Sequence, residues 1–241
     1  ISTNYKNAKA GFREKMALTP CQAGRLQGAC KEAGIEESVY LSTCNRCELY
    51  GKGDYGQALT LLSGETKTDV SELKGCILIK RGEAAIRHLF HVASGMDSMV
   101  IGEDEILGQL RRAYLSAKDG GFTGFYFNTV FQAALEAAKR VKTQTLLSKS
   151  SVSIATLAAA QCHRFLEGKK RVLLMGGSGD TGRKVIKNLL SYGDCEITAT
   201  VRESHSLPEG VRIVPFADRY LYMQEADIII SATSSPHYTV T

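Results

Sequence analysis

A cysteine close to an arginine is the first feature of this sequence that could carry out covalent chemistry. Cys44 and Arg46 lie in residues 41–50, between two short stretches with the residue pattern of strands. A cation near a thiol favours the thiolate, which is the nucleophilic form. The segment therefore predicts a thiol able to attack a carbonyl, and the residue types alone leave a plain, unreactive thiol as an equal alternative.

The spacing of Cys44 and Cys47 also fits a redox pair or half of a metal site. No second C-x-x-C and no H-x-x-x-H completes a metal set, so we expect no metal. A thioredoxin motif would open a helix, whereas this pair joins two expected strands.

A glycine-rich turn is the second candidate site. It has the pattern G-x-G-x-x-G, follows an apolar strand and opens a helix, where backbone N–H groups and the helix dipole can hold a pyrophosphate. Arg202, at the end of the next expected strand, suits a 2′-phosphate and favours NADP, although Glu203 leaves NAD open. A ligand-free turn is the alternative. The turn comprises Gly177, Ser178, Gly179, Asp180, Thr181 and Gly182.

A third group interleaves histidines and acids with apolar helix positions. His88 and His91 are spaced to share one helical face, and Glu103 and Glu105 stand at an expected helix start. On residue types alone, the simplest explanation is a half-buried histidine and acids that a helix N-terminus stabilises.

The pattern of elements predicts an α/β multidomain protein. Residues 1–81 read as β-α-β-β-α-β, the ferredoxin-like order with a four-stranded antiparallel sheet, and residues 82–147 read as helices. Residues 148–241 alternate strand, glycine turn, helix and strand, as at the start of a doubly wound Rossmann-type sheet that is incomplete at four strands. The expected strands of the first part are 2–4, 38–43, 47–51 and 76–80, and its main helices are 20–33, 57–62, 83–94, 105–118 and 129–145.

Composition excludes several classes of protein. The 241 residues are 44% hydrophobic and 23% charged, which is ordinary for a globular chain and excludes disordered, collagen-like and coiled-coil sequences. The apolar runs are too short to cross a bilayer, so we expect no membrane association. Seven scattered cysteines fit a reducing compartment. The net charge of +5 permits a polyanionic partner without requiring one.

Several segments, taken together, resemble glutamyl-tRNA reductase. They are Ser42-Thr-Cys-Asn-Arg-x-Glu-Leu-Tyr50, His88-Leu-Phe, Ala93-Ser-Gly-x-Asp-Ser-Met-Val-x-Gly-Glu103, Ile106-Leu-Gly-Gln109 and Ala138-Lys-Arg-Val-x-Thr143, in the family's order. The resemblance extends over the whole chain and is more specific than any single motif.

The resemblance implies NADPH-dependent reduction of glutamyl-tRNA(Glu) to glutamate-1-semialdehyde, the first step of tetrapyrrole synthesis from glutamate. It implies that Cys44 forms a thioester, that His88 tunes the thiolate or moves protons, and that Arg46 binds the substrate carboxylate. The remaining residues of the glutamyl pocket would be Thr43, Asn45, Ser98, Glu103, Asp104, Glu105 and Gln109.

The resemblance also implies a homodimer in the full-length protein through a C-terminal domain that this chain lacks, and hand-over of the product to glutamate-1-semialdehyde aminomutase. The expected location is the cytoplasm, or the plastid stroma for a plant protein. Tyr5, His91 and Glu105 depart from the family's usual His, Arg and Gln. Glu105 matters most, because an ionised carboxylate would repel a carboxylate substrate unless it faces the substrate's ammonium group or is protonated.

Two alternatives remain. One is another NADP-linked semialdehyde dehydrogenase that works through a cysteine thioester without tRNA. The other is a non-catalytic module that binds tRNA and nucleotide. Basic side chains on the expected helices are candidates for contacts with tRNA phosphates: Arg111, Arg112, Lys118, Lys139, Arg140 and Lys142.

Overall fold

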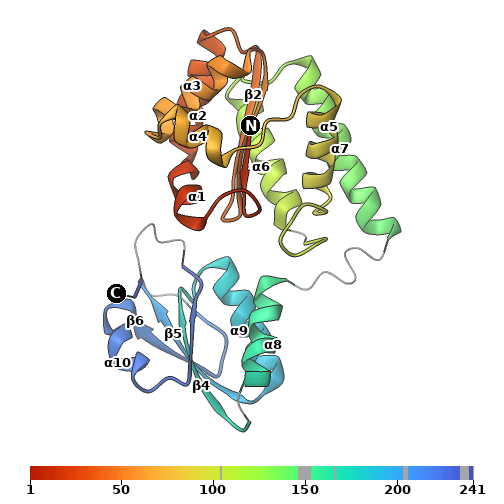
Figure 1. Ribbon diagram of the computed structural model, residues 1–241. Coiled ribbons are helices and arrows are strands. Elements are labelled where there is room, and N and C mark those ends of the chain that lie inside the picture. Colours follow the sequence, from red (N-terminus) through yellow and green to blue (C-terminus); the bar gives the residue numbers. More distant parts are fainter. Residues whose placement is uncertain (104, 146–152, 166, 203–205, 234–238, 241) are drawn as a thin grey trace. The chain divides into compact units, whose positions relative to one another are not determined.

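The computed structural model describes residues 1–103, 105–145, 153–165, 167–202, 206–233 and 239–240. The chain forms two compact units, Ile1–Ser151 and Val152–Thr241 (Figure 1). Each unit has its own sheet and its own apolar core, and each is described by itself.

The first unit is built on a three-stranded antiparallel sheet. Its strands are β1 (Ser2–Asn4), β2 (Glu37–Ser42) and β3 (Arg46–Lys52), in the order β1-β3-β2. Side chains alternate between the faces of a strand, and directly opposed residues of an antiparallel pair share a face. Arg46, Glu48 and Tyr50 alternate along β3 and form a polar row on one face of the strand. Leu41 lies opposite Glu48 and Asn4 lies opposite Arg46, so these two residues share the face of the polar row.

Four helices cover one face of this sheet. Their apolar side chains meet Tyr40 and Leu49 in one core. The second helix starts at a capping box in which Thr19 and Gln22 bond each other's backbone N–H, and Pro20 occupies the first turn. The helices are α1 (Ala10–Met16), α2 (Pro20–Glu32), α3 (Tyr55–Thr66) and α4 (Val70–Cys76).

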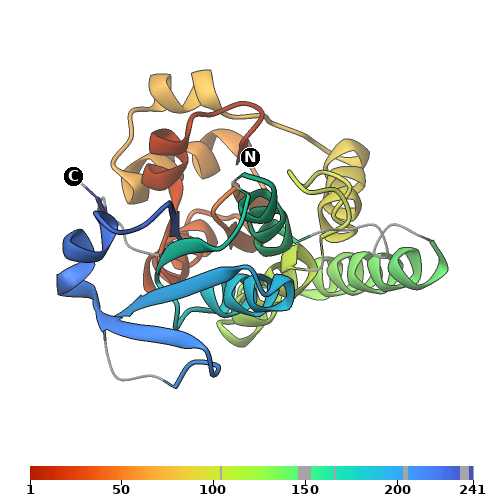
Figure 2. The same cartoon turned by 90° about the horizontal axis from the view of Figure 1, so that it is seen from below.

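Three further helices cover the other face. They are α5 (Glu83–Ala93), α6 (Glu105–Asp119) and α7 (Phe125–Gln144), and Figure 2 shows α7 along its length. Leu110 of α6 and Phe131 of α7 are fully buried against Val39 and Leu41 of β2. The polar row of β3 therefore faces the helical layer rather than solvent.

The expected strand over residues 76–80 is wrong, so the four-stranded ferredoxin-like sheet is not formed. Over these residues α4 continues to Cys76, and one bridge joins Leu78 to Ser2, with N–H···O distances of 2.8 Å in both directions. The bridge lies beside β1, where the fourth strand of the ferredoxin-like order would pair. Leu78 and Ile79 are 44% and 38% exposed. Little apolar surface would therefore be buried if this segment paired with β1 beyond the single bridge.

The second unit contains a parallel sheet with the order β6-β5-β4-β7. That is the order of the first four strands of a doubly wound fold. Two helices, α8 (Ile154–Phe165) and α9 (Asp180–Tyr192), pack side by side on one face (Figure 1). The strands are β4 (Lys170–Met175), β5 (Cys195–Val201), β6 (Val211–Pro215) and β7 (Ile228–Ser231), and a short α10 (Arg219–Met223) precedes β7.

Within the described ranges, no helix combines the length and the apolar character needed to cross a membrane.

Candidate active site

A tight turn between β2 and β3 presents Cys44 to solvent. The Thr43 hydroxyl accepts hydrogen bonds from the backbone N–H of Asn45 (3.3 Å) and of Arg46 (3.0 Å), and the Thr43 N–H donates to the Arg46 carbonyl (2.8 Å). The Arg13 guanidinium donates to the Cys44 carbonyl over 3.4 Å. Thr43 therefore shapes the backbone that carries the exposed thiol.

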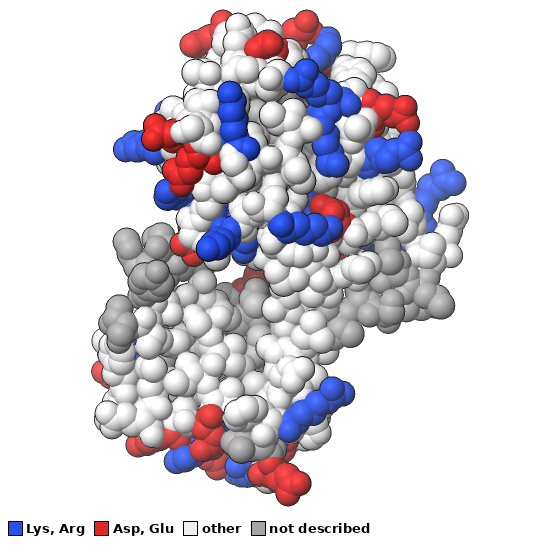
Figure 3. Space-filling view, in the orientation of Figure 1, with Lys and Arg blue, Asp and Glu red and all other residues white. Residues whose placement is uncertain are grey.

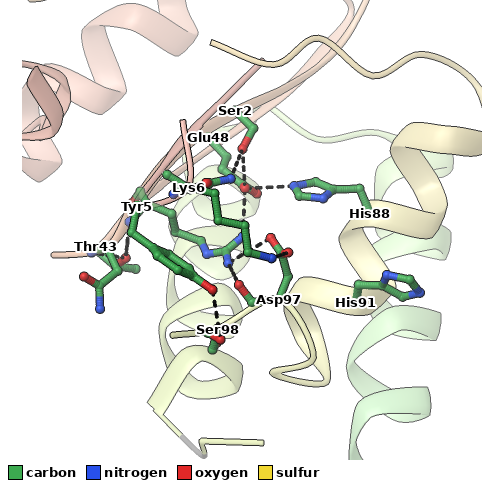
Figure 4. A network of polar contacts seen from close by, with 12 residues as sticks. Ser2, Tyr5, Lys6, Thr43, Glu48, His88, His91, Asp97 and Ser98 are labelled. Carbon is green, nitrogen blue, oxygen red and sulfur yellow. Dashed lines mark hydrogen bonds and ion pairs between the residues drawn. The ribbon is translucent and has the colours of Figure 1, made fainter. Parts of the chain in front are cut away.

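Glu48 is the centre of a buried polar network on the adjacent strand (Figure 4). One carboxylate oxygen accepts from the Ser2 hydroxyl (2.8 Å), from Arg46 Nη1 (2.9 Å) and from His88 Nε2 (2.8 Å). The other oxygen accepts from the Tyr50 hydroxyl. The side chain is 1% exposed, so these four donors replace water completely.

The network keeps Glu48 ionised. Burial alone would raise its pKa, but the hydrogen bond and charge of His88, then the charge of Arg46 and the Tyr50 hydroxyl, outweigh it and lower the pKa to about 2. An ionised Glu48 can only accept, so the proton that His88 shares with it lies on Nε2.

Arg46 is held between two carboxylates. Its side chain is 2% exposed, and Nη2 donates to the carbonyl (2.5 Å) and to Oδ2 (3.1 Å) of Asp97. The other carboxylate oxygen of Asp97 contacts Lys6 Nζ at 2.6 Å. A chain of alternating charges thus runs from Lys6 through Asp97 and Arg46 to Glu48 (Figure 4).

Ser98 supplies a buried hydroxyl without a partner. The residue is 5% exposed, and its Oγ has no hydrogen bond within the described part of the chain. The Tyr5 hydroxyl donates to the Ser98 carbonyl at 3.4 Å, and Gly102 N–H closes the surrounding loop on Gly95 at 3.0 Å. A buried orphan hydroxyl costs free energy unless a ligand or water satisfies it, so Ser98 marks a place where a polar group is expected to bind.

The thiol is not activated in the way the sequence predicts. Neighbouring protein atoms remove part of the hydration of the sulfur, and this desolvation raises the pKa of Cys44. The carboxylates of Glu103 and Glu105 add to the shift, and Arg13 opposes it. Arg46 donates to Glu48 and Asp97 instead. The expectation that Arg46 lowers the pKa of this thiol is therefore wrong, because β3 turns that guanidinium toward the helical layer.

The remaining predicted residues are distributed as follows. Glu103 and Glu105 lie close enough to Cys44 to affect its pKa, and Gln109 is half-buried on α6. His88 points toward Glu48, whereas His91 points away from the network (Figure 4). Asp104 lies outside the described residues. Lys142, one of the expected tRNA contacts, donates to the carbonyls of Gly102 (3.0 Å) and Glu103 (2.8 Å).

Sequence reasoning gave no role to Glu48 or Asp97. Both belong to the motifs that carry the resemblance. A carboxylate in a short strand or a loop is usually solvent-exposed, so neither was expected to be part of a buried network. The signal that could have found Glu48 is its period-2 spacing with Arg46 and Tyr50, which puts all three on one face of β3.

Cys44 and Cys47 are both free thiols, and their surroundings differ. Cys44 is exposed, whereas Cys47 is buried with its sulfur 3.9 Å from the Ser42 hydroxyl and 3.8 Å from the Arg13 carbonyl. In the described ranges no three His, Cys, Asp or Glu side chains gather closely enough to hold a metal ion.

The glycine-rich turn of the second unit has the close approaches of a phosphate-binding loop. A Cβ on Gly182 would lie 2.2 Å from the Gly176 carbonyl, and one on Gly177 would lie 2.8 Å from Ala199. Gly176 has φ +84°, a conformation that favours glycine. Helix α9 begins after Gly179 without a side-chain cap, so its first N–H groups are available to an anion.

The end of β5 carries the other predicted cofactor residue. Arg202 is exposed, with its guanidinium carbon 5.3 Å from the centre of the Phe216 ring. The neighbouring Thr200 is fully buried, and its hydroxyl has no partner in the described ranges. Ser178, Asp180 and Thr181 lie in the turn and at the start of α9, while Glu203 lies outside the described residues.

Comparison with known proteins places the chain among one group of enzymes. Residues 1–145 match the family model described as glutamyl-tRNAGlu reductase, N-terminal domain. Glutamyl-tRNA reductases of Deinococcus radiodurans and Marinobacter nauticus are 34% and 33% identical over 100% and 98% of this chain. The structure of glutamyl-tRNA reductase from Methanopyrus kandleri is 32% identical, with a TM-score of 0.58 over 99% of the chain. The chain spans 69%, 57% and 59% of the lengths of these three proteins.

Proposed function

We propose, from the premise that this chain belongs to the glutamyl-tRNA reductase family, that its protein reduces the glutamyl group of glutamyl-tRNA(Glu) to glutamate-1-semialdehyde. This is the entry step of tetrapyrrole synthesis from glutamate. The observation that carries the proposal is the exposed Cys44 thiol, presented by a hydrogen-bonded turn next to the buried Arg46–Glu48–His88 network.

The first step is acyl transfer to Cys44. The thiolate attacks the carbonyl carbon of the aminoacyl ester, a C–S bond forms, the C–O bond to the terminal ribose breaks, and the ribose oxygen takes a proton. The product is a thioester on Cys44 and free tRNA. A thioester carbonyl accepts a hydride more readily than an ester carbonyl, which gives the covalent step its purpose.

The substrate itself would help to activate the thiol. Desolvation of the sulfur raises the pKa of Cys44, and the carboxylates of Glu103 and Glu105 raise it further. The ammonium group of the glutamyl moiety, placed near these carboxylates, would cancel their field and lower the pKa of the thiol. In this placement Glu105 would attract the substrate's ammonium group rather than repel its carboxylate.

His88 is suited to carry the proton of the leaving group. Its Nε2 donates to Glu48, so Nδ1 is the nitrogen that can accept or pass a proton. Glu48 stabilises the imidazolium that forms, as a buried carboxylate does beside a catalytic histidine. Arg46 would bind the substrate carboxylate in exchange for Asp97, and the orphan hydroxyl of Ser98 would bind another polar group of the substrate.

The second unit has residues that fit a dinucleotide. The close glycine contacts and the uncapped start of α9 suit a pyrophosphate, and Arg202 suits the 2′-phosphate of NADPH. NADPH would supply the hydride that reduces the thioester to the aldehyde. The residues from Gly177 to Gly182 would hold the phosphates, while Cys44 and His88 hold the acyl group and the proton.

An acid-quenched gel after exposure to tRNA charged with radiolabelled glutamate, without NADPH, tests the proposal. We expect label on the wild type, release of that label by hydroxylamine, and no label on Cys44→Ser. Cys21→Ser is the matched control, because it removes another exposed thiol from the same unit and should be labelled like the wild type.

Absence of label on folded wild type would favour the binding-module alternative. Labelling by a free or phosphorylated acid, but not by the charged tRNA, would favour another thioester-forming dehydrogenase. Dimerisation, transfer of the product to the aminomutase and a cytoplasmic location stay predictions.

A further inference from the structure

Two cavities adjoin on the first unit beside the His88–Glu48 pair. Their volumes are about 540 and about 580 Å³, and both lie in the range of pockets that hold small ligands. They share Leu78, Lys80, Arg81 and His88 along the segment between α4 and α5. A ligand could therefore extend from one cavity into the other without leaving the protein surface.

The second cavity is cationic. Lys6, Lys80, Arg81 and Arg87 line it, against the carboxylates of Glu83 and Asp97. Figure 3 shows that Lys and Arg side chains are interspersed with Asp and Glu on the visible face of the first unit.

Both of the cavity's acids are already paired. Glu83 contacts Arg87 at 2.7 Å, and Asp97 contacts Lys6 and Arg46. Lys80 is exposed and has no ion-pair partner in the described ranges. The cavity therefore presents positive charge that its own acids do not neutralise, as a phosphate site requires.

The first cavity is mainly apolar and carries an aromatic platform at its rim. Tyr55 is 42% exposed, and the Arg81 guanidinium stacks over its ring at 3.8 Å. Ile79 and Tyr126, which also line the cavity, are 38% and 43% exposed. Aromatic rings and stacked guanidinium groups are the surfaces on which unpaired bases stack.

We propose that the two cavities together bind the single-stranded 3′ end of a charged tRNA, with phosphates in the cationic cavity and a base stacked at Tyr55 and Arg81. This inference rests on the proposed function. Cys44 is to attack the ester and His88 is to give the leaving ribose oxygen its proton, so the terminal nucleotide must lie beside His88, which lines both cavities. A cationic cavity next to an aromatic one offers the two contacts that single-stranded nucleic acid uses.

The chain offers a pair of variants that tests the proposal. Lys80→Ala/Arg81→Ala removes two exposed cations from the cavities, and Lys15→Ala/Arg25→Ala removes two exposed cations from α1 and α2. Binding of intact tRNA(Glu), and of the same tRNA without its four terminal 3′ nucleotides, is measured at several salt concentrations. Circular dichroism checks that each variant is folded.

We expect the Lys80→Ala/Arg81→Ala variant to bind intact tRNA about tenfold more weakly, with a salt slope reduced by about 1.4, or about 0.7 for each lost contact to a single strand. Its affinity for the truncated tRNA should equal that of the wild type, and Lys15→Ala/Arg25→Ala should bind both tRNAs as the wild type does. Tyr55→Ala should weaken only intact tRNA, with Tyr55→Phe restoring the affinity, because stacking needs the ring.

Equal loss of affinity for both tRNAs in the Lys80→Ala/Arg81→Ala variant would overturn the site, because the effect would then be general electrostatics. Unchanged affinity for intact tRNA would overturn it as well. In both cases labelling of Cys44 would leave the proposed function standing. If wild type neither binds tRNA nor is labelled at Cys44, the proposed function fails and the site fails with it.

Discussion

At the scale of single residues, Glu48 links His88 and Arg46, because its carboxylate accepts a hydrogen bond from each of them. It accepts from Ser2, Arg46, Tyr50 and His88 and is nearly inaccessible to solvent. Removing one partner from a buried charged network leaves the others uncompensated, which costs much more than losing an exposed ion pair. The stability of the first unit should therefore depend on the charge of this one side chain.

We predict that Glu48→Gln lowers the free energy of unfolding of the first unit by about 3 kcal/mol at pH 7. The pKa of Glu48 is lowered from 4.5 to about 2, so its stabilising contribution is complete above about pH 4.5 and is lost as the pH falls toward 2. Urea unfolding at pH 7 and at pH 3 should show the gap between wild type and variant narrowing at the lower pH.

The exposed Glu36, which pairs with Lys52, provides the control. Glu36→Gln should change the free energy of unfolding by less than about 1 kcal/mol at either pH. A gap for Glu48→Gln that stays constant between the two pH values would contradict the account of its ionisation.

The sequence pointed to Cys44 and His88 but not to the side chains that surround them. Residue types alone left an unreactive thiol and a half-buried histidine as good alternatives, so these two residues were singled out by the family resemblance, and their roles stay predictions. The contacts of Arg46 and Glu48 with Asp97 and Ser2 depend on strand register and on a loop distant in the sequence, and neither can be read from local spacing.

At the scale of elements, the glycine turn fixes how closely α9 approaches β4. A Cβ on Gly182 would collide with the Gly176 carbonyl, whereas one on Gly28 in α2 would meet no atom within 4 Å. Substitution by alanine should therefore lower the stability at Gly182 and raise it at Gly28.

We predict that Gly182→Ala destabilises the second unit and weakens NADPH binding at least tenfold, because the helix must move away from the turn that is to hold the phosphates. Gly28→Ala should instead raise the free energy of unfolding by about 0.5–1 kcal/mol, since alanine loses less backbone entropy in a helix. Thermal unfolding and NADPH fluorescence titration measure both effects. NADPH binding unchanged in Gly182→Ala would remove the turn from the cofactor site.

Helices with a regular apolar face were predicted well, and the shortest helices were not. The helices α2, α5 and α6 agree with their expected ranges within one residue at each end, because their apolar faces repeat regularly, whereas α7 begins at Phe125, four residues before its expected start. The seven-residue helices α1 and α4 were missed, since two turns carry too few periodic positions. The strand expected at 76–80 failed because apolar residues alone do not decide between an edge strand and an exposed connection.

At the scale of the whole molecule, the two units have separate cores, and such units commonly unfold independently. We predict two transitions in differential scanning calorimetry. Glu48→Gln should lower the midpoint of only one transition, and Gly182→Ala should lower that of only the other. A single transition that both variants shift together would show that the units unfold as one cooperative body.

Asp97 has a consequence for how the site chooses its anion. The Asp97 carboxylate belongs to the same chain as Arg46 and is bonded to it, so it has a high effective concentration there. An incoming carboxylate must compete with it. Small free anions such as acetate or chloride lack the local concentration to displace it. A glutamyl group delivered by a bound macromolecule arrives with an effective concentration of its own. Arg46 would then exchange the Asp97 carboxylate for the substrate carboxylate and keep an anionic partner throughout. Selectivity for the glutamyl group over free anions would come from its delivery by tRNA as much as from the shape of the pocket.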